Sequence, residues 1–160
     1  MPDRPPLEFW FEFASTYSYL SAARITDLAS AAGVTVRWRP FLLGPIFAAQ
    51  GWNTSPFTLY PAKGAYMWRD MARIAAARGL PFRQPARFPQ NGLMAARVAL
   101  AALAHDTESG QRFCVAVYRA QFADGADISD PETLAVALAT AGAPDACLDR
   151  AASPGIKQLL

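Results

Sequence analysis

Residues 7–20, LEFWFEFASTYSYL, contain the change of pattern that decides the fold. Aromatic and apolar residues alternate with Glu8 and Glu12, which predicts a buried strand over Leu7–Phe13. The strand pattern then stops, and a helical pattern begins directly after Ser15. We therefore expect Ser15 to cap the N-terminus of this helix. Its hydroxyl and the unpaired N–H groups of the first helical turn would together form a site for an anion.

The segments that follow this corner complete a βαβ unit. The helix is predicted to run from Ser15 to about Ala32 and to end at Gly33. Positions spaced by about 100° predict an apolar face made of Tyr17, Leu20, Ile25, Leu28, Ala31 and Ala32. Alternation over Val34–Leu43 predicts a second strand, which Pro40 ends or interrupts with a bulge. A strand, a helix and a strand in this order indicate two parallel strands.

The remaining hundred or so residues are predicted to be helical. Gly44–Pro61 is rich in proline and glycine, so we expect a loop there with one helical turn around Ile46–Ala49. Apolar periodicity and end signals predict helices over Gly64–Arg78, Gly92–His105, Ser109–Phe122 and Asp130–Ala141, with a short one from Pro144. Two parallel strands are too few for an independently stable sheet, so more strands are expected than this sequence supplies.

Composition and charge narrow the classes of partner. The chain has 160 residues, 52% of them hydrophobic, which suits one packed globular unit. A net charge of +2 with scattered arginines does not indicate a nucleic-acid partner. No apolar run approaches the roughly 18 residues of a membrane span, and the first residues lack the apolar segment of a signal peptide. We therefore expect no membrane partner and a cytoplasmic location.

Cysteine and histidine usage excludes two kinds of chemistry. Cys114 and Cys147 lie far apart in helical segments, without the spacing of a redox pair or a metal site, and are expected to be reduced core thiols. Ser15 lacks the flanking glycines of a hydrolase elbow. The single histidine, His105, lies at a helix end, where the helix dipole is sufficient explanation for it. A serine hydrolase is therefore disfavoured.

A thiol oxidoreductase is the other class that this corner suggests. A strand, a corner, a helix and a second strand are how a thioredoxin-like domain begins, with a C-x-x-C pair at the corner. Here residues 15–18 read STYS, so the corner cannot form a disulfide. It could still bind a thiolate supplied by another molecule, because a hydroxyl donor and helix N–H groups lower the pKa of a nearby thiol.

Two segments of the sequence resemble a known family. Residues 11–20, FEFASTYSYL, resemble the motif F-[DE]-x-x-S-P-[FY]-S-Y-L of the 2-hydroxychromene-2-carboxylate isomerases and kappa-class glutathione transferases, with Thr16 in place of the usual proline. Residues 51–66 contain GWN and PAKGAY, which are similar to the G-N-x-P and K-x-x-Y segments of that family.

The resemblance implies a function and roles for particular residues. Ser15 would be the catalytic residue that holds the sulfur of glutathione, and Asn53 and Lys63 would bind the rest of this cofactor. An ordinary turn residue is an equal alternative for Asn53. A lysine at a helix start is electrostatically misplaced, which favours an anionic ligand at Lys63. The implied activity is glutathione-dependent cis-trans isomerisation of an aromatic-catabolism intermediate.

Substrate contacts and assembly are further implications. Asn91, Arg87 and Trp68 could line the pocket of a small aromatic substrate, although a loop cap or a surface aromatic explains each equally well. A homodimer is expected from the family. A glutathione transferase that conjugates electrophiles, or a glutathione-binding protein without catalysis, remain the alternative functions.

The same resemblance implies an α/β fold, a thioredoxin-like βαβ unit with a large all-helical insertion. Residues 1–43 would form the N-terminal half of the thioredoxin-like domain and residues 44–152 the helical insertion. Residues 153–160 would begin the return to the first domain. Family members continue from there into two further strands and a helix, which we expect to be absent from these 160 residues.

Overall fold

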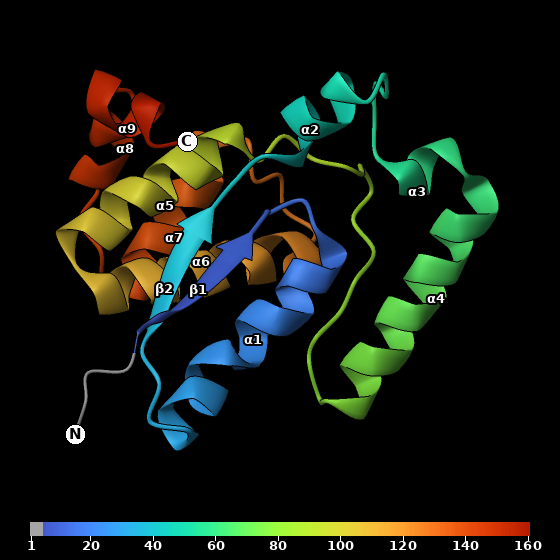
Figure 1. The fold of residues 1–160 in the computed structure, drawn as a ribbon, viewed down its shortest axis with the longest axis horizontal. Coiled ribbons are helices and arrows are strands. Elements are labelled where there is room, and N and C mark those ends of the chain that lie inside the picture. Colours follow the sequence, from blue (N-terminus) through green and yellow to red (C-terminus); the bar gives the residue numbers. More distant parts are fainter. Residues whose placement is uncertain (1–4) are drawn as a thin grey trace.

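A computed structural model describes residues 5–160 and has the predicted α/β start (Figure 1). Two parallel strands are joined by one helix: β1 (Leu7–Phe11), α1 (Thr16–Ala31) and β2 (Val36–Pro40). Phe9 lies opposite Trp38, and Phe11 lies opposite Pro40 at the end of the ladder. Pro40 ends the second strand, as its missing N–H predicts.

The rest of the described chain is helical. Its elements are α2 (Leu43–Ala49), α3 (Pro56–Leu59), α4 (Pro61–Ala77), α5 (Leu93–His105), α6 (Thr107–Arg119), the π-helical turn η1 (Ala120–Asp124), α7 (Pro131–Ala141), α8 (Ala146–Arg150) and α9 (Pro154–Gln158). The segment predicted to be a loop with one turn therefore contains two helices, α2 and α3. No helix within residues 5–160 is long and apolar enough to cross a membrane.

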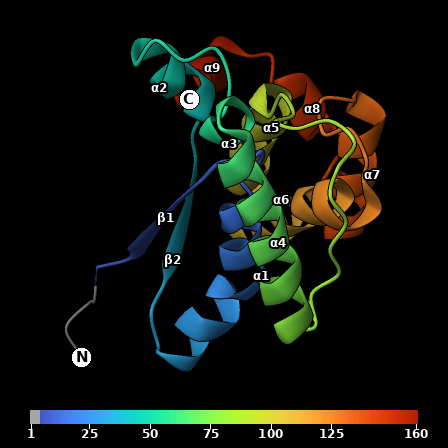
Figure 2. The ribbon, with the colours of Figure 1, turned by 90° about the vertical axis from the view of Figure 1, so that its right-hand side faces the viewer.

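Helices α1, α4, α6 and α7 lie to one side of the two strands in Figure 2. Helix α5 packs on β2 and on α6, and α6 also packs on α1 and α7. Helix α4 runs alongside α1, and in Figure 1 it lies on the far side of α1 from α5. Figure 2 shows α4 in front of α1, with α6 and α7 to one side. The chain then returns from the end of α4 through an extended segment to α5.

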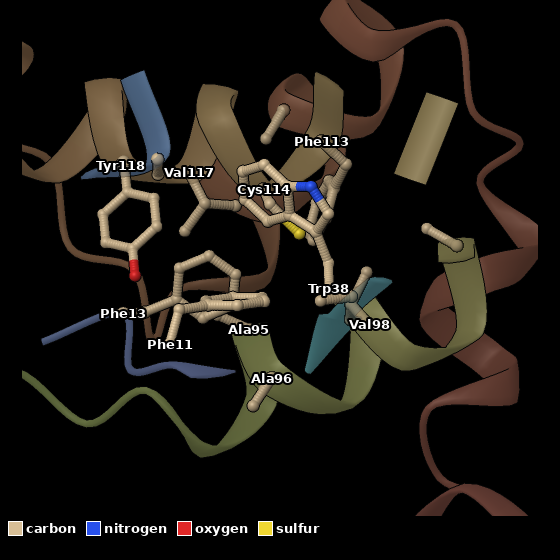
Figure 3. Packing of buried hydrophobic residues seen from close by; sticks show 14 of the residues in the cluster. Phe11, Phe13, Trp38, Ala95, Ala96, Val98, Phe113, Cys114, Val117 and Tyr118 are labelled. Atoms are coloured by element: carbon tan, nitrogen blue, oxygen red, sulfur yellow. The ribbon is translucent and has the colours of Figure 1, made fainter. Parts of the chain in front are cut away.

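The core lies between the strands and helices α5 and α6 (Figure 3). Phe11 contacts Trp38 and Phe13 edge-on, with ring centroids 5.3 Å apart in both pairs. Phe13 continues the cluster to Tyr118 of α6, at 5.1 Å. The buried residues of α5 are mainly alanine, whose small side chains let α5 and α6 approach closely. A side chain at Gly110 of α6 would lie 2.6 Å from the α5 backbone.

The buried face of α1 differs from the predicted one. Tyr17 and Leu28 were expected in the core but are 39% and 51% exposed. Leu20 is buried as predicted, and Tyr19 and Ala22, which were not assigned to this face, are buried with it. Helix α1 contacts both α4 and α6, so its buried surface is set by two neighbours and not by a single apolar stripe.

Candidate functional site

The corner between β1 and α1 has the geometry that its sequence predicts. Ser15 has extended backbone angles (φ −83°, ψ 120°) and caps α1, and its Oγ accepts a hydrogen bond from the N–H of Ser18 at 3.3 Å. This bond uses a lone pair of the oxygen, so the hydroxyl hydrogen can still be donated to a ligand. The positive end of the α1 dipole lies at the same place. The corner therefore offers hydrogen-bond donors to an electron-rich atom.

Ser15 lies in the wall of an open cavity of about 690 Å³. The cavity is bounded by the corner and by segments 42–57 and 88–93, which come from distant parts of the sequence. Its apolar wall consists of Leu42, Leu43, Pro45, Phe47, Trp52, Phe57, Phe88, Pro89 and Leu93. Its volume suits a small organic molecule together with a short peptide.

Glu12 is a buried carboxylate in the same wall. Its side chain is almost fully buried, yet it forms no ion pair with any of residues 5–160. Oε1 accepts from the N–H of Ala14 at 3.2 Å, and Oε2 accepts from the N–H of Leu43 at 2.8 Å. Burial raises the pKa of Glu12, while the bonds from Leu43 and Ala14 act in the opposite direction. Glu12 therefore ties the corner to the first residue of α2.

Backbone contacts also hold the corner. The hydroxyl of Tyr118 donates to the main-chain carbonyl of Glu12 at 2.8 Å, and the N–H of Ser15 donates to the same carbonyl at 3.0 Å. Burial holds the pKa of Tyr118 well above its ordinary value, so this phenol stays a donor. The strand end is thus fixed to α6 directly beside Ser15.

Two predicted binding residues, Asn53 and Asn91, lie in the cavity wall with Ser15. Asn53 is an exposed residue of the loop between α2 and α3. Asn91 uses its Oδ1 to accept from the N–H of Leu93 at 3.0 Å, so it also stabilises the start of α5. The loop-cap role considered for Asn91 is therefore present in the structure, together with its position at the cavity.

The other three predicted residues lie outside the cavity wall. Lys63 is exposed in the first turn of α4, with its Nζ 5.6 Å from the ring centre of Phe57, which does line the cavity. Trp68 packs edge-on against Phe88 at 4.8 Å and so supports the wall from behind. Arg87 points away and pairs with Asp127 at 3.2 Å, with its side chain 74% exposed.

Sequence reasoning did not assign Glu12 to the site. It treated this residue as one of the polar positions that alternate with the aromatic residues of β1. An acidic residue three positions before Ser15, at the end of an apolar strand, was the available signal. Burial of its carboxylate depends on Leu43 and Gly92 from other segments, and a Cβ at Gly92 would lie only 2.7 Å from Oε1.

Two known proteins share part of this sequence. Glutathione S-transferase kappa 1 of Caenorhabditis elegans is 33% identical over 89 residues, 55% of this chain and 38% of that protein. A 2-hydroxychromene-2-carboxylate isomerase of Sphingobium xenophagum is 29% identical over 129 residues, 80% of this chain and 64% of that protein. The chain thus spans less than two thirds of the length of either relative.

A solved structure and a family model place the fold. The structure of a 2-hydroxychromene-2-carboxylate isomerase matches with a TM-score of 0.79 and 23% identity, covering 94% of this chain and 73% of the other. At this identity the match establishes the fold alone. The family model of the DsbA-like thioredoxin domain matches residues 6–160. Since that match spans almost the whole sequence, the chain belongs to the DsbA-like thioredoxin domain family.

Proposed function

We propose that this protein is a glutathione-dependent cis-trans isomerase of the 2-hydroxychromene-2-carboxylate isomerase type, acting on a small aromatic substrate. The observation that carries the proposal is the position of Ser15: its hydroxyl caps α1 and lies in the wall of a largely apolar cavity. Two of the relatives are isomerases of this name. The corner has no cysteine of its own, so a sulfur that acts there must come from a ligand.

The residues of the corner fit a thiolate better than a metal or a phosphate. Ser15 and the first turn of α1 supply neutral donors, which suit one diffuse negative charge. No lysine, arginine or histidine among the described residues lines the cavity, so a multiply charged anion would lack a counter-charge there. Bound glutathione would supply a nucleophilic sulfur that can add to a conjugated substrate and leave again.

The protein would contribute position and electrostatics to this reaction. Ser15 would hold the sulfur and favour its ionised form by donating its hydroxyl hydrogen. Asn53 and Lys63 would bind the polar parts of glutathione. Lys63 extends from α4 beside Phe57, so its flexible ammonium could reach a carboxylate at the cavity rim. Phe47, Trp52 and Phe88 would shield the conjugated substrate from water.

Asn91, Arg87 and Trp68 would contribute to substrate binding in three different ways. Asn91 lies in the wall and could contact substrate directly. Trp68 would act through Phe88, against which it packs. Arg87 would have to release Asp127 before it could contact a ligand. We also propose the division into residues 1–43, 44–152 and 153–160 and a homodimer, because the resembling family suggests them. A cytoplasmic location is a further proposal, made from the sequence pattern alone.

Exchange of Ser15 for alanine tests the proposal. We expect Ser15→Ala to lose most of the isomerase activity, since removal of one donor to a developing anion costs about 10²–10³-fold in rate. Ser21→Ala, at an exposed position of the same helix, is the matched control and should keep full activity. Full turnover by Ser15→Ala would refute the assignment.

Glutathione binding can be measured without turnover. A ligand that binds only the folded state raises the melting temperature, so millimolar glutathione should stabilise the wild-type protein. Absence of any shift would contradict the proposal that glutathione is bound.

Conjugation of glutathione to an electrophile is the second candidate function. The 33% identity to a kappa-class glutathione transferase favours it, and the same corner would serve it. Assays of isomerisation and of conjugation on the same preparation separate the two. A protein that binds glutathione but performs neither reaction would support the third alternative, a non-catalytic binding protein.

A further inference from the structure

The cavity contains one titratable side chain among the residues that the structure describes. Its wall includes no histidine, lysine, arginine, cysteine, tyrosine or aspartate, and Glu12 is its single acidic residue. A thiol that docks at Ser15 must lose its proton to become nucleophilic. The wall offers one side chain that can accept that proton without help from bulk solvent.

The balance of charge at the corner also favours Glu12 as the proton acceptor. Glu12 has no cationic partner among residues 5–160. Burial raises its pKa, and the N–H groups of Leu43 and Ala14 act in the opposite direction by favouring the ionised form. If the proton of the thiol went to solvent, a thiolate and a carboxylate would lie together in a poorly solvated wall. If Glu12 accepts it, the corner keeps a single negative charge throughout.

The surroundings of Glu12 leave room for this exchange. Backbone N–H groups of Ala14, Leu43 and Phe13 act on the carboxylate, which has about four acceptor positions, so at least one lone pair stays available for a proton. Gly92 faces Oε1 without a side chain, and a Cβ there would collide with that oxygen. The titratable group that contacts Glu12 from α6 is Tyr118, which donates its hydroxyl to the main-chain carbonyl and not to the carboxylate.

We propose that Glu12 is the proton acceptor for the thiol that Ser15 binds. The S–H bond of the thiol breaks, its electron pair stays on sulfur, and an O–H bond forms on a carboxylate oxygen of Glu12. The net charge of the corner is unchanged. The proton returns to sulfur when the thiol leaves. This inference rests on the proposed function, because it takes glutathione as the thiol, and it adds the residue that makes its sulfur reactive.

A proton inventory of binding tests the proposal without measuring turnover. Thiolate formation is followed by its ultraviolet absorbance, and proton release by calorimetry in buffers of different ionisation enthalpy. In the wild-type protein we expect thiolate to form with almost no proton released, because Glu12 keeps it. In Glu12→Gln, one proton should be released for each thiolate formed, at whatever pH the thiolate appears.

Controls separate the failure of this inference from the failure of the proposed function. Glu8→Gln, an exposed glutamate of the same strand, should behave as the wild-type protein does. S-methylglutathione has no thiol proton and should bind without proton release. Release of one proton per thiolate by the wild-type protein, or binding without any thiolate, would overturn the role of Glu12. These wild-type measurements decide the matter even if Glu12→Gln does not fold. Absence of glutathione binding would instead refute the proposed function.

Discussion

Gly92 provides a precise test of how the site is built. Its backbone angles (φ −83°, ψ 2°) suit any residue, so Gly92→Ala introduces no backbone strain. The added Cβ would lie 2.7 Å from Oε1 of Glu12, whereas ordinary contacts begin at 3.4 Å. The carboxylate must therefore move by about 0.7 Å. A shift of this size would break its bond to Ala14 or to Leu43, which are 3.2 and 2.8 Å long.

The expected loss of stability follows from these contacts. One hydrogen bond to a charged group contributes about 1.5–3 kcal/mol. Replacing glycine by alanine at a position whose backbone angles allow it stabilises the folded protein by about 0.4–1 kcal/mol, because the unfolded chain has less conformational entropy. We therefore expect Gly92→Ala to lower the free energy of unfolding by about 1–2 kcal/mol, measured by urea denaturation with circular dichroism.

A matched variant and a double variant isolate the cause. Gly44 lies in α2, also borders the cavity, and has no atom within 4 Å of its Cβ position, so Gly44→Ala should be neutral or stabilising by about 0.5 kcal/mol. In a Glu12→Ala background the collision is gone, and Gly92→Ala should then cost almost nothing. An equal cost in both backgrounds would show that the carboxylate contact is not responsible.

Three further predictions concern the packing around the corner. Tyr118→Phe removes the bond to the Glu12 carbonyl, which keeps its bond from Ser15, so denaturant unfolding should show a loss of only about 1 kcal/mol. Gly110→Ala places a Cβ 2.6 Å from the Leu103 backbone and should cost about 1–3 kcal/mol by the same measurement; an unchanged midpoint would contradict the close approach of α5 and α6. The pKa of Glu12 is raised above 4.5 in the folded state, so its contribution to stability is present below pH 4.5 and lost as pH rises through the folded pKa. The stability of the wild-type protein relative to Glu12→Gln should therefore fall over that interval, and a difference independent of pH would refute the raised pKa.

The corner was predictable from the sequence because its causes are local. Alternation in residues 7–13 requires a strand, and a serine followed by a helical pattern gives an N-cap. The helix that begins after Asp130 and ends at Gly142 was predicted for the same reason. In each case a side chain bonds to a backbone group only two or three residues away.

One turn of α2, around Ile46–Ala49, was predicted, but the rest of α2 and all of α3 were not, because proline was taken as a breaker. Pro45 lies in the first turn of α2, and Pro56 is the first residue of α3, positions where the missing N–H costs nothing. The cavity itself could not be predicted from local pattern. It joins the corner to segments about 30 and 75 residues further along the chain, and only tertiary packing brings them together.

The position of Lys63 has two physical explanations, an anionic ligand and a contact with an aromatic ring. A lysine in the first turn of α4 opposes the helix dipole, which suggested an anionic ligand. The structure adds a local reason, because the ammonium lies 5.6 Å above the ring of Phe57. A cation over an aromatic face at an exposed site gains about 0.5–1 kcal/mol, similar in size to the dipole penalty. Binding of glutathione carboxylates must therefore be tested on Lys63 directly.

The basicity of Glu12 bears on which group could act as a nucleophile in the proposed reaction. Proton transfer from an ordinary thiol of pKa about 8.5 to a carboxylate of pKa 4.5 costs about 5 kcal/mol. Two features of the site reduce the cost of this proton transfer. Burial raises the pKa of Glu12, and the first turn of α1 lowers the pKa of a bound thiol. The hydroxyl of a serine holds its proton far more tightly than a thiol does, so transfer of that proton to the same carboxylate would cost several times more. Under the proposed function, Glu12 would therefore be too weak a base to make Ser15 a nucleophile but would assist a bound thiol. Under the proposed function, the serine would serve as a donor and the ligand as the nucleophile.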